Sequence, residues 1–368
     1  MSQQFDFCIL GAGLAGLSIA DSLAEHDFST AVIDREDIAA GASGTPGGLV
    51  NPATGRRAKK VWKAEQCYTT TLQCLQKVQE TTEDHFFAKN GVLRPALMEK
   101  MARKMRNEYE QTSWPKDWCQ WKSEGQIKEM HPGITCVNGG LWLPVGLTVD
   151  VGQYLHAYAA YLEQEAGTTF FLNQDPIERY DDGYWRIKLE KTMIRAKHIV
   201  FATGRATATS YHWDWLPFNL IKGQVAEFKT ANNALGFDHS ISSLGYMARL
   251  GYDGTFIQGS TYEHDYTHLD PDDQGEEYLR KRLRRTLPRL EKDVTTVNQW
   301  AGVRTSTPDY MPILGQHPTD KNLHLFSGLG SKGLLHSKFL ADHYVDHLVN
   351  GSELYPEIDI RRYCLTNT

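Results

Sequence analysis

Three glycines near the start of the chain are spaced for chemistry with a dinucleotide, in the pattern G-x-G-x-x-G: Gly11, Gly13 and Gly16. The apolar run 5–10 in front of them predicts a buried strand, and residues 14–26 place apolar side chains on one helical face. A second predicted strand, 30–33, leads directly to Asp34. In such a βαβ unit the glycines allow a tight turn, close approach of the backbone to a pyrophosphate and close helix packing, while the acidic residue meets ribose hydroxyls. The motif predicts dinucleotide binding but does not distinguish FAD from NAD, and an incidental glycine-rich turn is the alternative.

Three later segments also combine small residues with predicted strands. Residues 38–52 hold four glycines and two prolines, which predicts a long irregular loop that can lie flat against a large planar ligand. The predicted strand 196–204 ends in a small-residue turn that can bring backbone against a nucleotide. Over 323–349 the order of strand, Gly-x-Gly-x-x-Gly and helix occurs again, which by itself is compatible with a second dinucleotide site. A surface loop and an ordinary strand exit are the alternatives for the first two segments.

The composition restricts the class of protein. A chain of 368 residues with 41% hydrophobic and 23% charged residues can bury a large core, and we expect two domains. The net charge of −6 gives no overall field that favours nucleic acid or an anionic membrane. No apolar run reaches the roughly 20 residues that span a membrane, and the first predicted strand starts too early for a signal peptide. The six cysteines form no C-x-x-C pair, so we expect free thiols in a reducing cytoplasm and no metal site.

Segments outside these motifs carry weaker signals. A basic cluster precedes a predicted helix: Arg56, Arg57, Lys59 and Lys60. Such a cluster is typical of a solvated helix start, and the alternative is a port for an anionic part of a substrate or cofactor. The strongly charged stretch 273–286 predicts a helix with a solvated face. Residues 139–144 predict a strand that returns to the first domain.

Taken together, the motifs resemble those of the D-amino-acid-oxidase-type flavoenzymes, a family that includes glycine oxidase, sarcosine oxidase and the oxidoreductase domain of the bifunctional tRNA wobble-uridine modification enzyme. The resemblance covers essentially the whole chain and is greatest to glycine oxidase and to the tRNA-enzyme domain. Several ordered motifs at matching distances are more specific than the first motif alone. They are Gly11-x-Gly13-x-x-Gly16, Gly41-Ala-Ser-Gly44 with Gly48-Leu49, Ala202-Thr-Gly204, Gly223-Gln224, Gly259-Ser-Thr-Tyr-Glu263, Trp300-Ala-Gly302-x-Arg304-x4-Asp309-x2-Pro312-x2-Gly315 and Gly328-x-Gly330-Ser-x-Gly333.

The resemblance implies FAD rather than NAD as the cofactor. It implies an α/β fold, α+β overall, in which a Rossmann-like FAD-binding domain accompanies a second, mainly antiparallel-sheet substrate domain. The FAD-binding domain is expected over 1–84, 146–215 and 300–368, and the substrate-binding domain over 85–145 and 216–299. The second glycine-rich helix start then serves the ring end of the same flavin. The residues expected to contact FAD are Gly11, Gly13, Leu14, Ala15, Gly16, Asp34, Arg35, Ala42, Ser43, Gly44, Gly48, Leu49, Ala202, Thr203, Gly204, Gly302, Gly330, Ser331, Lys332, Gly333 and Leu334.

Two residues receive substrate roles from the resemblance. Arg304 stands where glycine-oxidase-like members hold the substrate carboxylate, and Tyr246 stands where a tyrosine adds a hydroxyl to the same carboxylate. A planar guanidinium binds a carboxylate through two parallel hydrogen bonds, which fixes the α-carbon over the flavin. The alternatives are a structural salt bridge for Arg304 and a half-buried strand position for Tyr246.

Three positions depart from the family pattern. Gly302 stands where sarcosine-oxidase relatives carry a cysteine bound covalently to the flavin, so we expect non-covalent FAD. Ile257 stands where the same relatives place a lysine near the flavin, which leaves either oxygen or another compound as the electron acceptor. Residues 305–308 are bulkier than in glycine oxidase, so the identity of its substrate does not carry over.

The expected function is a FAD-dependent amine or amino-acid oxidoreductase, either an oxidase or a dehydrogenase. Arg304 and Tyr246 would hold the carboxylate of a small-molecule substrate, and hydride would pass from its C–N carbon to flavin N5. Two alternatives keep the fold: demodification of a tRNA wobble-uridine side chain with the basic cluster on phosphates, and oxidation of a 2-hydroxy acid. A flavin-binding structural factor is a third. The pI of about 6.2 argues against nucleic acid, and an oligomer is compatible with the sequence.

Overall fold

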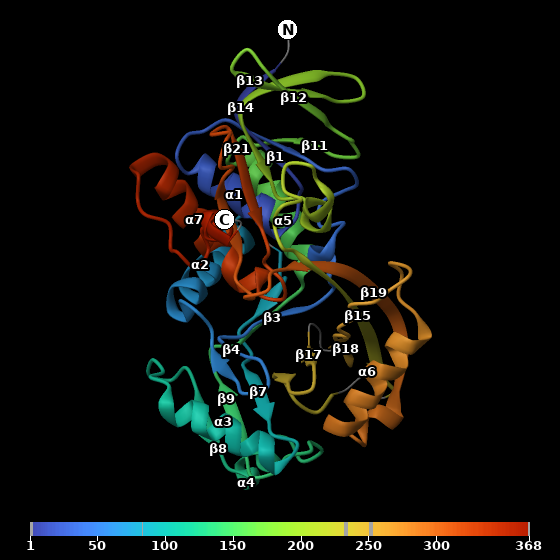
Figure 1. Cartoon of the computed structure of the whole chain (residues 1–368). Helices are drawn as coiled ribbons and strands as arrows, with labels where there is room; N and C mark the ends of the chain where they lie inside the picture. The colour runs from blue at the N-terminus through green and yellow to red at the C-terminus, as the bar shows by residue number, and fades with distance from the viewer. Residues whose placement is uncertain (1–2, 83, 232–234, 250–252, 367–368) are drawn as a thin grey trace.

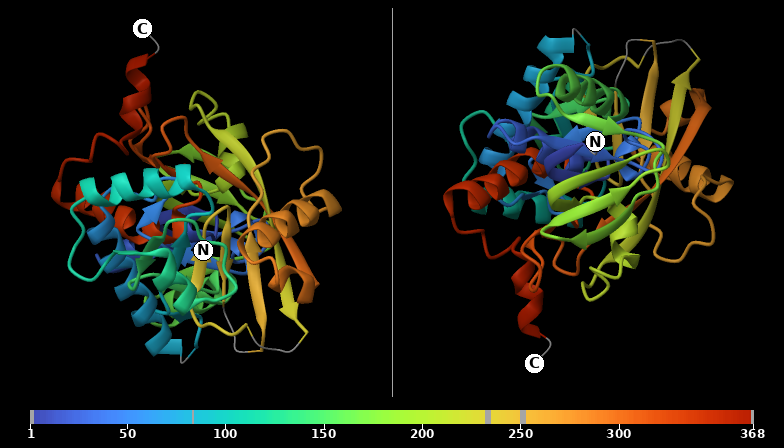
Figure 2. Two further views of the ribbon diagram at one scale, coloured as in Figure 1. Left: turned by 90° about the horizontal axis from the view of Figure 1, so that it is seen from below. Right: turned by 90° about the horizontal axis from the view of Figure 1, so that it is seen from above.

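The computed structural model describes residues 3–82, 84–231, 235–249 and 253–366. Two large sheets organise these residues, one in the upper and one in the lower half of Figure 1, with short strands between them. The 3-10 helix η4 (Ile360–Thr366) extends away from the body in both views of Figure 2. The other 3-10 helices are η1 (Ala42–Gly44), η2 (Gly204–Thr209) and η3 (Leu290–Asp293).

The first sheet is parallel at its centre. Its strands are β1 (Gln4–Leu10), β2 (Thr30–Ile33), β11 (Thr169–Phe171), β12 (Ile177–Asp181), β13 (Tyr184–Lys188), β14 (Met193–Phe201), β20 (Ile313–Gln316) and β21 (Leu323–Ser327). Their order is β11-β2-β1-β14-β13-β12, and β21 pairs with the second half of β14 and with β20. β11, β2, β1, β14 and β21 are parallel, whereas β12, β13 and β20 are antiparallel additions.

Helices pack on one face of this sheet: α1 (Leu14–Ala24), α2 (Ala64–Thr82), α5 (Val151–Gln164) and α7 (Gly333–Asn350). Successive side chains of β1 alternate between the faces. Phe7 and Ile9 pack with the helices, and Cys8 and Leu10 pack on the opposite side with Trp185. A strand covered on both faces reads as an apolar run, and the second half of β1, from Phe7 to Leu10, has this pattern.

The second sheet is mainly antiparallel. Its strands are β7 (Val92–Pro95), β8 (Gln120–Lys122), β9 (Gly140–Leu143), β15 (Asn219–Thr230), β16 (Ser240–Ser242), β17 (Tyr246–Ala248), β18 (Thr255–Gly259) and β19 (Val294–Ser306). Their order is β19-β15-β18-β17-β16-β7-β9-β8, and only β7 and β16 are parallel to each other among these pairs. α6 (Asp273–Thr286) packs on it through Leu279 and Leu283, which meet Phe228 and Phe256. α3 (Glu99–Gln111) and α4 (Glu124–Met130) lie beside β9 and β8 (Figure 1).

Short strands lie between the large sheets. β3 (Gly48–Val50), β10 (Leu147–Val149) and β6 (Phe87–Ala88) form one small sheet, and β4 (Ala53–Thr54) pairs with β5 (Lys59–Lys60). The strand predicted at 139–144 is β9, which pairs with β7 and β8 of the second sheet before the chain continues to β10. Leu141 and Leu143 are fully buried with Val92 and Met105, so packing against α3 keeps this strand there.

The predicted α/β class with a second, mainly antiparallel sheet is confirmed. β2, α6 and β21 begin and end at the predicted residues 30–33, 273–286 and 323–327. The exact domain boundaries stay a prediction. All six cysteines are free thiols. Across the described ranges, no helix is long and apolar enough to cross a membrane, and no three His, Cys, Asp or Glu side chains are grouped to hold a metal ion.

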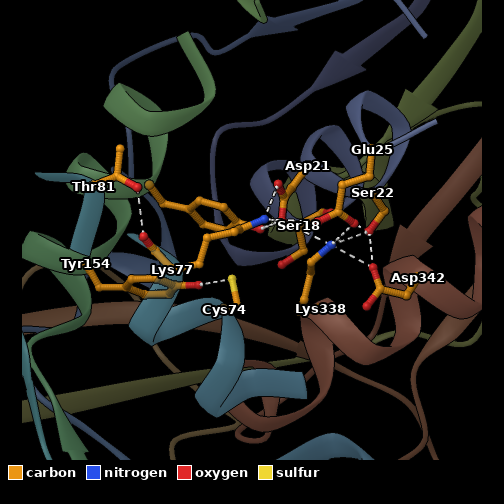
Figure 3. Close-up of polar contacts among 11 residues, drawn as sticks. Ser18, Asp21, Ser22, Glu25, Cys74, Lys77, Thr81, Tyr154, Lys338 and Asp342 are labelled. Carbon is orange, nitrogen blue, oxygen red and sulfur yellow. Dashed lines mark hydrogen bonds and ion pairs between the residues drawn. The ribbon is translucent and has the colours of Figure 1, made fainter. Parts of the chain in front are cut away.

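A group of buried charges joins α1, α2 and α7 (Figure 3). Asp21 on α1 is buried, and its carboxylate lies 2.9 Å from Lys77 of α2 and 3.0 Å from Lys338 of α7. Lys338 also lies 2.8 Å from Glu25 and 2.7 Å from Asp342. Burial alone would lower the pKa of Lys338, but the carboxylates of Asp21, Asp342 and Glu25 raise it above its ordinary value. The ammonium therefore stays charged and holds α1 and α7 together.

Replacing Lys338 with methionine should lower the free energy of unfolding by about 3–5 kcal/mol, because the buried carboxylate of Asp21 loses one of its two cations. Chemical denaturation followed by circular dichroism measures this change. Lys197→Met is the control, since Lys197 pairs with Asp6 at 2.8 Å on the surface, where such pairs contribute about 0–1 kcal/mol. Equal losses in the two variants would contradict a special contribution from the buried group.

Candidate active site

A cavity of about 1970 Å³ is lined by residues of both large sheets. One wall contains the carboxyl ends of parallel strands: Leu10 of β1, Ile33 of β2, Phe201 of β14 and Ser327 of β21. The opposite wall comes from β15, β17 and β19 of the second sheet. In α/β sheets, ligands bind in the crevice outside the carboxyl ends of the strands. The cavity therefore lies where the fold class predicts a ligand.

The turn between β1 and α1 forms part of the cavity wall. Gly11 has a φ of +107°, and a Cβ there would lie 2.5 Å from the carbonyl oxygen of Ala202, so glycine permits this close approach to the end of β14. A Cβ at Gly16 would overlap the carbonyl of Gly11, so Gly16 lets α1 pack on the turn. The helix has no side-chain cap at Gly13, and its first residues line the cavity. An uncapped helix N-terminus of this kind binds phosphate through its free N–H groups.

Polar side chains complete this end of the cavity. Asp34 Oδ2 accepts a hydrogen bond from the N–H of Ala12 at 2.8 Å, and its Oδ1 accepts from the N–H of Glu36 at 3.0 Å. Ser43 Oγ accepts from the N–H of Leu14 at 3.1 Å. Asp34 and Ser43 both line the cavity. The turn is thus braced by the acidic residue that is predicted to meet ribose and by the small-residue loop that follows it.

A second uncapped helix start lines the same cavity. α7 begins at Gly333 and receives no side-chain cap from Lys332. Gly330, with a φ of +55°, and Gly333 line the cavity. Lys332 does not, because its Nζ donates to the carbonyl of Tyr310 at 3.1 Å, and burial lowers its pKa. The positive end of α7 can therefore stabilise an electron-rich group in the cavity.

Most of the residues predicted to contact FAD line this cavity, and three do not. Lys332 is turned away, and Gly16 and Gly44 lie behind the wall, where a Cβ at Gly44 would overlap the carbonyl of Ala39. Arg35 lines the cavity and pairs with Asp175 at 2.6 Å in an exposed contact. The contacts with FAD themselves stay predictions. The others that line the cavity are Gly11, Gly13, Leu14, Ala15, Asp34, Ala42, Ser43, Gly48, Leu49, Ala202, Thr203, Gly204, Gly302, Gly330, Ser331, Gly333 and Leu334.

Arg304 of β19 is half-buried and lines the cavity. Its Nη2 donates to Ser260 Oγ at 2.6 Å, and its Cζ lies 4.7 Å from the centre of the Tyr262 ring. Its Nη1 is buried without a hydrogen-bond partner, and no carboxylate among the described residues lies within 4.0 Å of the guanidinium. The structural salt bridge considered as the alternative is therefore not observed in this part of the chain. A desolvated cation without a counter-charge is costly, so the site favours an anionic ligand.

Tyr246 of β17 lines the cavity as well, but its hydroxyl is already engaged. It donates to the carbonyl of Gly47 at 2.8 Å, and the ring occupies the space that a Cβ at Gly259 would need. Burial raises the pKa of Tyr246 above its ordinary value, so the phenol stays neutral. A carboxylate beside Arg304 would compete with Gly47 for this hydroxyl.

Five basic side chains of α3, α6 and the turn after β4 line the part of the cavity that we call its α3–α6 end: Arg56, Lys100, Lys104, Arg282 and Arg285. None of the five has a carboxylate within 4.0 Å in the described ranges. From the basic cluster at 56–60, only Arg56 lines the cavity, while Lys60 pairs with Glu65 at 2.6 Å. The face of α6 that was predicted to be solvated also contributes to the cavity, because Arg282 and Arg285 line it.

The sequence reasoning did not assign three residues around Arg304: Gly223, Ser260 and Tyr262. A Cβ at Gly223 would overlap the guanidinium, so glycine on β15 provides the space that Arg304 occupies. All three belong to motifs noted in the sequence, Gly223-Gln224 and Gly259-Ser-Thr-Tyr-Glu263. No local spacing rule indicates that these motifs meet Arg304, since the register of β15 on β19 brings them together.

The residues present fit a flavin dinucleotide. Two uncapped helix starts line one cavity, and they suit a pyrophosphate at α1 and an electron-rich ring at α7. Glycine backbone forms the surface between them, and the buried Nη1 of Arg304 adds a cation for a second ligand. The fold and this cavity define the class of dinucleotide-binding α/β proteins that carry a second, mainly antiparallel sheet.

The chain belongs to the DAO family of FAD dependent oxidoreductases, which its residues 6–346 match. It is 24% identical over 383 residues to the tRNA 5-methylaminomethyl-2-thiouridine biosynthesis bifunctional protein MnmC of Hydrogenovibrio crunogenus, an alignment that covers 93% of this chain and 55% of that protein. The chain thus spans about half the length of the curated relatives that it matches. The protein is a FAD-dependent oxidoreductase, as the sequence predicts.

Solved structures share the fold at low sequence identity. Glycine oxidase from Geobacillus kaustophilus gives a TM-score of 0.85 with 21% identity, and the match covers 100% of both chains. Iminodiacetate oxidase from Chelativorans sp. BNC1 gives a TM-score of 0.77 with 22% identity, over 97% of this chain and 98% of that one. At these identities the likeness establishes the fold and leaves the substrate open.

Gly11→Ala should abolish or strongly weaken FAD retention, because the new Cβ would lie 2.5 Å from the carbonyl oxygen and 2.9 Å from the carbonyl carbon of Ala202. The ratio of visible flavin absorbance to protein absorbance after purification measures retention. Gly41→Ala is the matched control, since a Cβ at this cavity-lining glycine meets nothing within 4 Å. Full retention in Gly11→Ala would show that the turn does not need this close approach.

Proposed function

We propose that the protein oxidises the C–N bond of an amino acid or secondary amine that carries a carboxylate. The observation that carries this proposal is the buried, unpaired Nη1 of Arg304 in the cavity that the predicted FAD contacts also line. A carboxylate there would satisfy Nη1 and compensate the buried charge. The names of two structural relatives, glycine oxidase and iminodiacetate oxidase, support an amine with a carboxylate as the substrate class.

In this proposal the protein contributes mainly binding and orientation. Arg304 holds the carboxylate, and Tyr246 borders the same space. FAD, held without a covalent bond, would supply the redox chemistry as the acceptor of the hydride from the carbon next to nitrogen. The nitrogen would release a proton to water as the C–N bond becomes an imine, water would hydrolyse the imine to a carbonyl compound and an amine, and oxygen or another compound would take up the electrons. The FAD-binding segments 1–84, 146–215 and 300–368 and the substrate-binding segments 85–145 and 216–299 form two domains in the same proposal.

Arg304→Ala should weaken binding of carboxylate substrates on the order of a hundredfold, because it removes the charged partner of a desolvated pair. Anaerobic titration of the holoenzyme with glycine, sarcosine, proline and both enantiomers of common amino acids, followed by flavin bleaching, measures the change. Arg179→Ala, at an exposed position of β12, is the control. Bleaching by 2-hydroxy acids alone would replace the amine in this proposal with a hydroxy acid.

An unchanged affinity and rate of flavin reduction in Arg304→Ala would contradict the carboxylate role. Readmission of air after bleaching then distinguishes an oxidase, whose flavin colour returns at once, from a dehydrogenase that needs another acceptor. If none of these compounds bleaches the flavin of the holoenzyme, the proposal of a small-molecule substrate is weakened and the second candidate function is favoured.

A second candidate places the same amine chemistry on an RNA. The five cations at the α3–α6 end of the cavity, which have no carboxylate partner among the described residues, favour it, since a phosphate backbone provides many negative charges. On α6 the contrast between neighbours is clear: Arg280, Lys281 and Arg284 each pair with a glutamate, whereas Arg282 and Arg285 have no carboxylate partner in the described ranges. The name of the MnmC relatives supports a modified tRNA uridine as the group oxidised.

This candidate predicts that Arg282→Gln with Arg285→Gln weakens tRNA binding and lowers the slope of log affinity against log salt by about 1–2. Filter binding over a range of salt concentrations measures both quantities. Lys281→Gln with Arg284→Gln is the matched control, because it removes the same charge from the same helix at positions already paired with glutamates. Equal effects of the two double variants would indicate non-specific electrostatic attraction and contradict a specific RNA-binding surface at Arg282 and Arg285.

A further inference from the structure

The guanidinium of Arg304 is oriented by a hydrogen bond at one nitrogen and by an aromatic ring. Ser260 Oγ accepts an N–H of Nη2 at 2.6 Å, and the Tyr262 ring centre lies 4.7 Å from Cζ. Gly223 has no side chain and leaves the space that the guanidinium occupies. Nη1 is buried without a partner, and Nη2 is the nitrogen that bonds a described residue. Ser260 and Tyr262 therefore fix the orientation of the cation while Nη1 and Nε remain without a hydrogen bond in the described ranges.

The segment that carries Ser260 and Tyr262 is anchored to β15. The N–H of Thr261 donates to the carbonyl of Gln224 at 3.1 Å, and the N–H of Gln224 donates to Thr261 Oγ1 at 2.8 Å. Lys222 and Glu263 exchange two backbone hydrogen bonds of 3.0 Å. Gly223, which makes room for Arg304, lies between these anchors in the chain. Ser260 and Tyr262 are therefore held in a fixed position relative to β15, whose Gly223 lies against the guanidinium of Arg304.

Buried charge reinforces the anchor from the other side. The ammonium of Lys222 is 1% exposed and lies 3.4 Å from Asp272 and 3.7 Å from Glu263. Gln224 Nε2 donates to both carboxylates at 3.0 Å. These contacts tie the segment 260–263 to the start of α6. The position of the Tyr262 ring is thus determined by packed neighbours although the ring itself is 54% exposed.

The Tyr262 ring borders the space beside Nη1. Nη1 is one bond from Cζ, so the ring centre lies at most about 6 Å from it. Tyr262 also lines the cavity. An aromatic ring at this distance attracts the cation and keeps water from one side of it, which strengthens a charge pair formed there.

We propose that Ser260 and Tyr262 are the positioning residues of the carboxylate site: they set the orientation of Arg304 so that Nη1 meets the substrate carboxylate, and Tyr262 covers the resulting ion pair. This inference rests on the proposed function, because it assigns the determinants of the same site. It predicts selectivity for carboxylates over neutral ligands of the same shape. Both residues act through Arg304 and take no part in the transfer of hydride.

The test uses the FAD-loaded protein and two probes of one shape, acetate and acetamide, with binding followed through the visible flavin spectrum. Ser260→Ala should weaken acetate binding about 3- to 10-fold through the lost hydrogen bond. Tyr262→Leu should weaken it about 3- to 30-fold through the lost ring, and Tyr262→Phe should bind acetate as the unaltered protein does. None of the three should alter the response to acetamide. His264→Ala, an exposed position in the same segment, is the control for a general disturbance.

The outcomes separate this inference from the proposed function. Acetate binding that is lost in Arg304→Ala but unchanged in Ser260→Ala and Tyr262→Leu would overturn the positioning role alone. Acetate binding that is unchanged in Arg304→Ala, or absent in the unaltered protein, would overturn the proposed function itself. Equal weakening for acetate and acetamide would mean that the variants only disturb the cavity, which also contradicts the inference. If Tyr262→Leu does not retain FAD, the smaller change Ser260→Ala decides the result.

Discussion

The ion pairs of Asp21 hold two helices in a fixed relation, and the cofactor cavity depends on that relation. Asp21 lies 3.0 Å from Lys338, so α1 and α7 are joined within about 10 Å of their N-termini. A shift of either helix along its axis would separate buried opposite charges, which is costly in a medium of low dielectric constant. The two uncapped helix starts therefore keep their spacing on one cavity, as a ligand with charge at two points requires.

The charge of Arg304 differs from that of Lys338, because no carboxylate among the described residues lies within 4.0 Å of its guanidinium. The cluster around Asp21 compensates its buried cation with carboxylates, whereas the guanidinium of Arg304 bonds a hydroxyl and lies against a ring, with no carboxylate partner among the residues described. The first arrangement stabilises the fold, and the second leaves the protein with an unmet charge until a ligand arrives. In the proposed function, a carboxylate would bind favourably because one guanidinium nitrogen is desolvated without a partner in the free protein.

The cavity combines two scales of recognition. Near Arg304 the surroundings suit a single carboxylate, since Tyr246 and Tyr262 border the same space. Farther along, the basic side chains of α3 and α6 provide charge over a wide surface. A small amine needs only the first region, and an amine carried by an RNA would use both. The low identity to relatives of either kind means that the side chains of this chain, and not the fold, determine which substrate it takes.

Local sequence determined the elements whose patterns are complete within a short stretch. The glycine turn, β2, α6 and β21 lie where periodicity and turn chemistry predict them, because each depends on neighbours along the chain. The family motifs added Arg304 and Tyr246 as candidates without showing what surrounds them. The partners of Arg304 were beyond such reasoning, since β19 pairs with β15 residues about eighty positions away, as in Ile221 opposite Arg304.

Only the tertiary structure decided that Arg304 has no counter-charge among the described residues, that Tyr246 is engaged by Gly47 and that Arg282 and Arg285 line the cavity. The same holds for β9, whose apolar residues are compatible with either sheet until α3 buries them. The physical reason is common to all four. Burial, charge compensation and strand register depend on contacts between segments that are distant in the sequence. The residue type at one position therefore does not predict them.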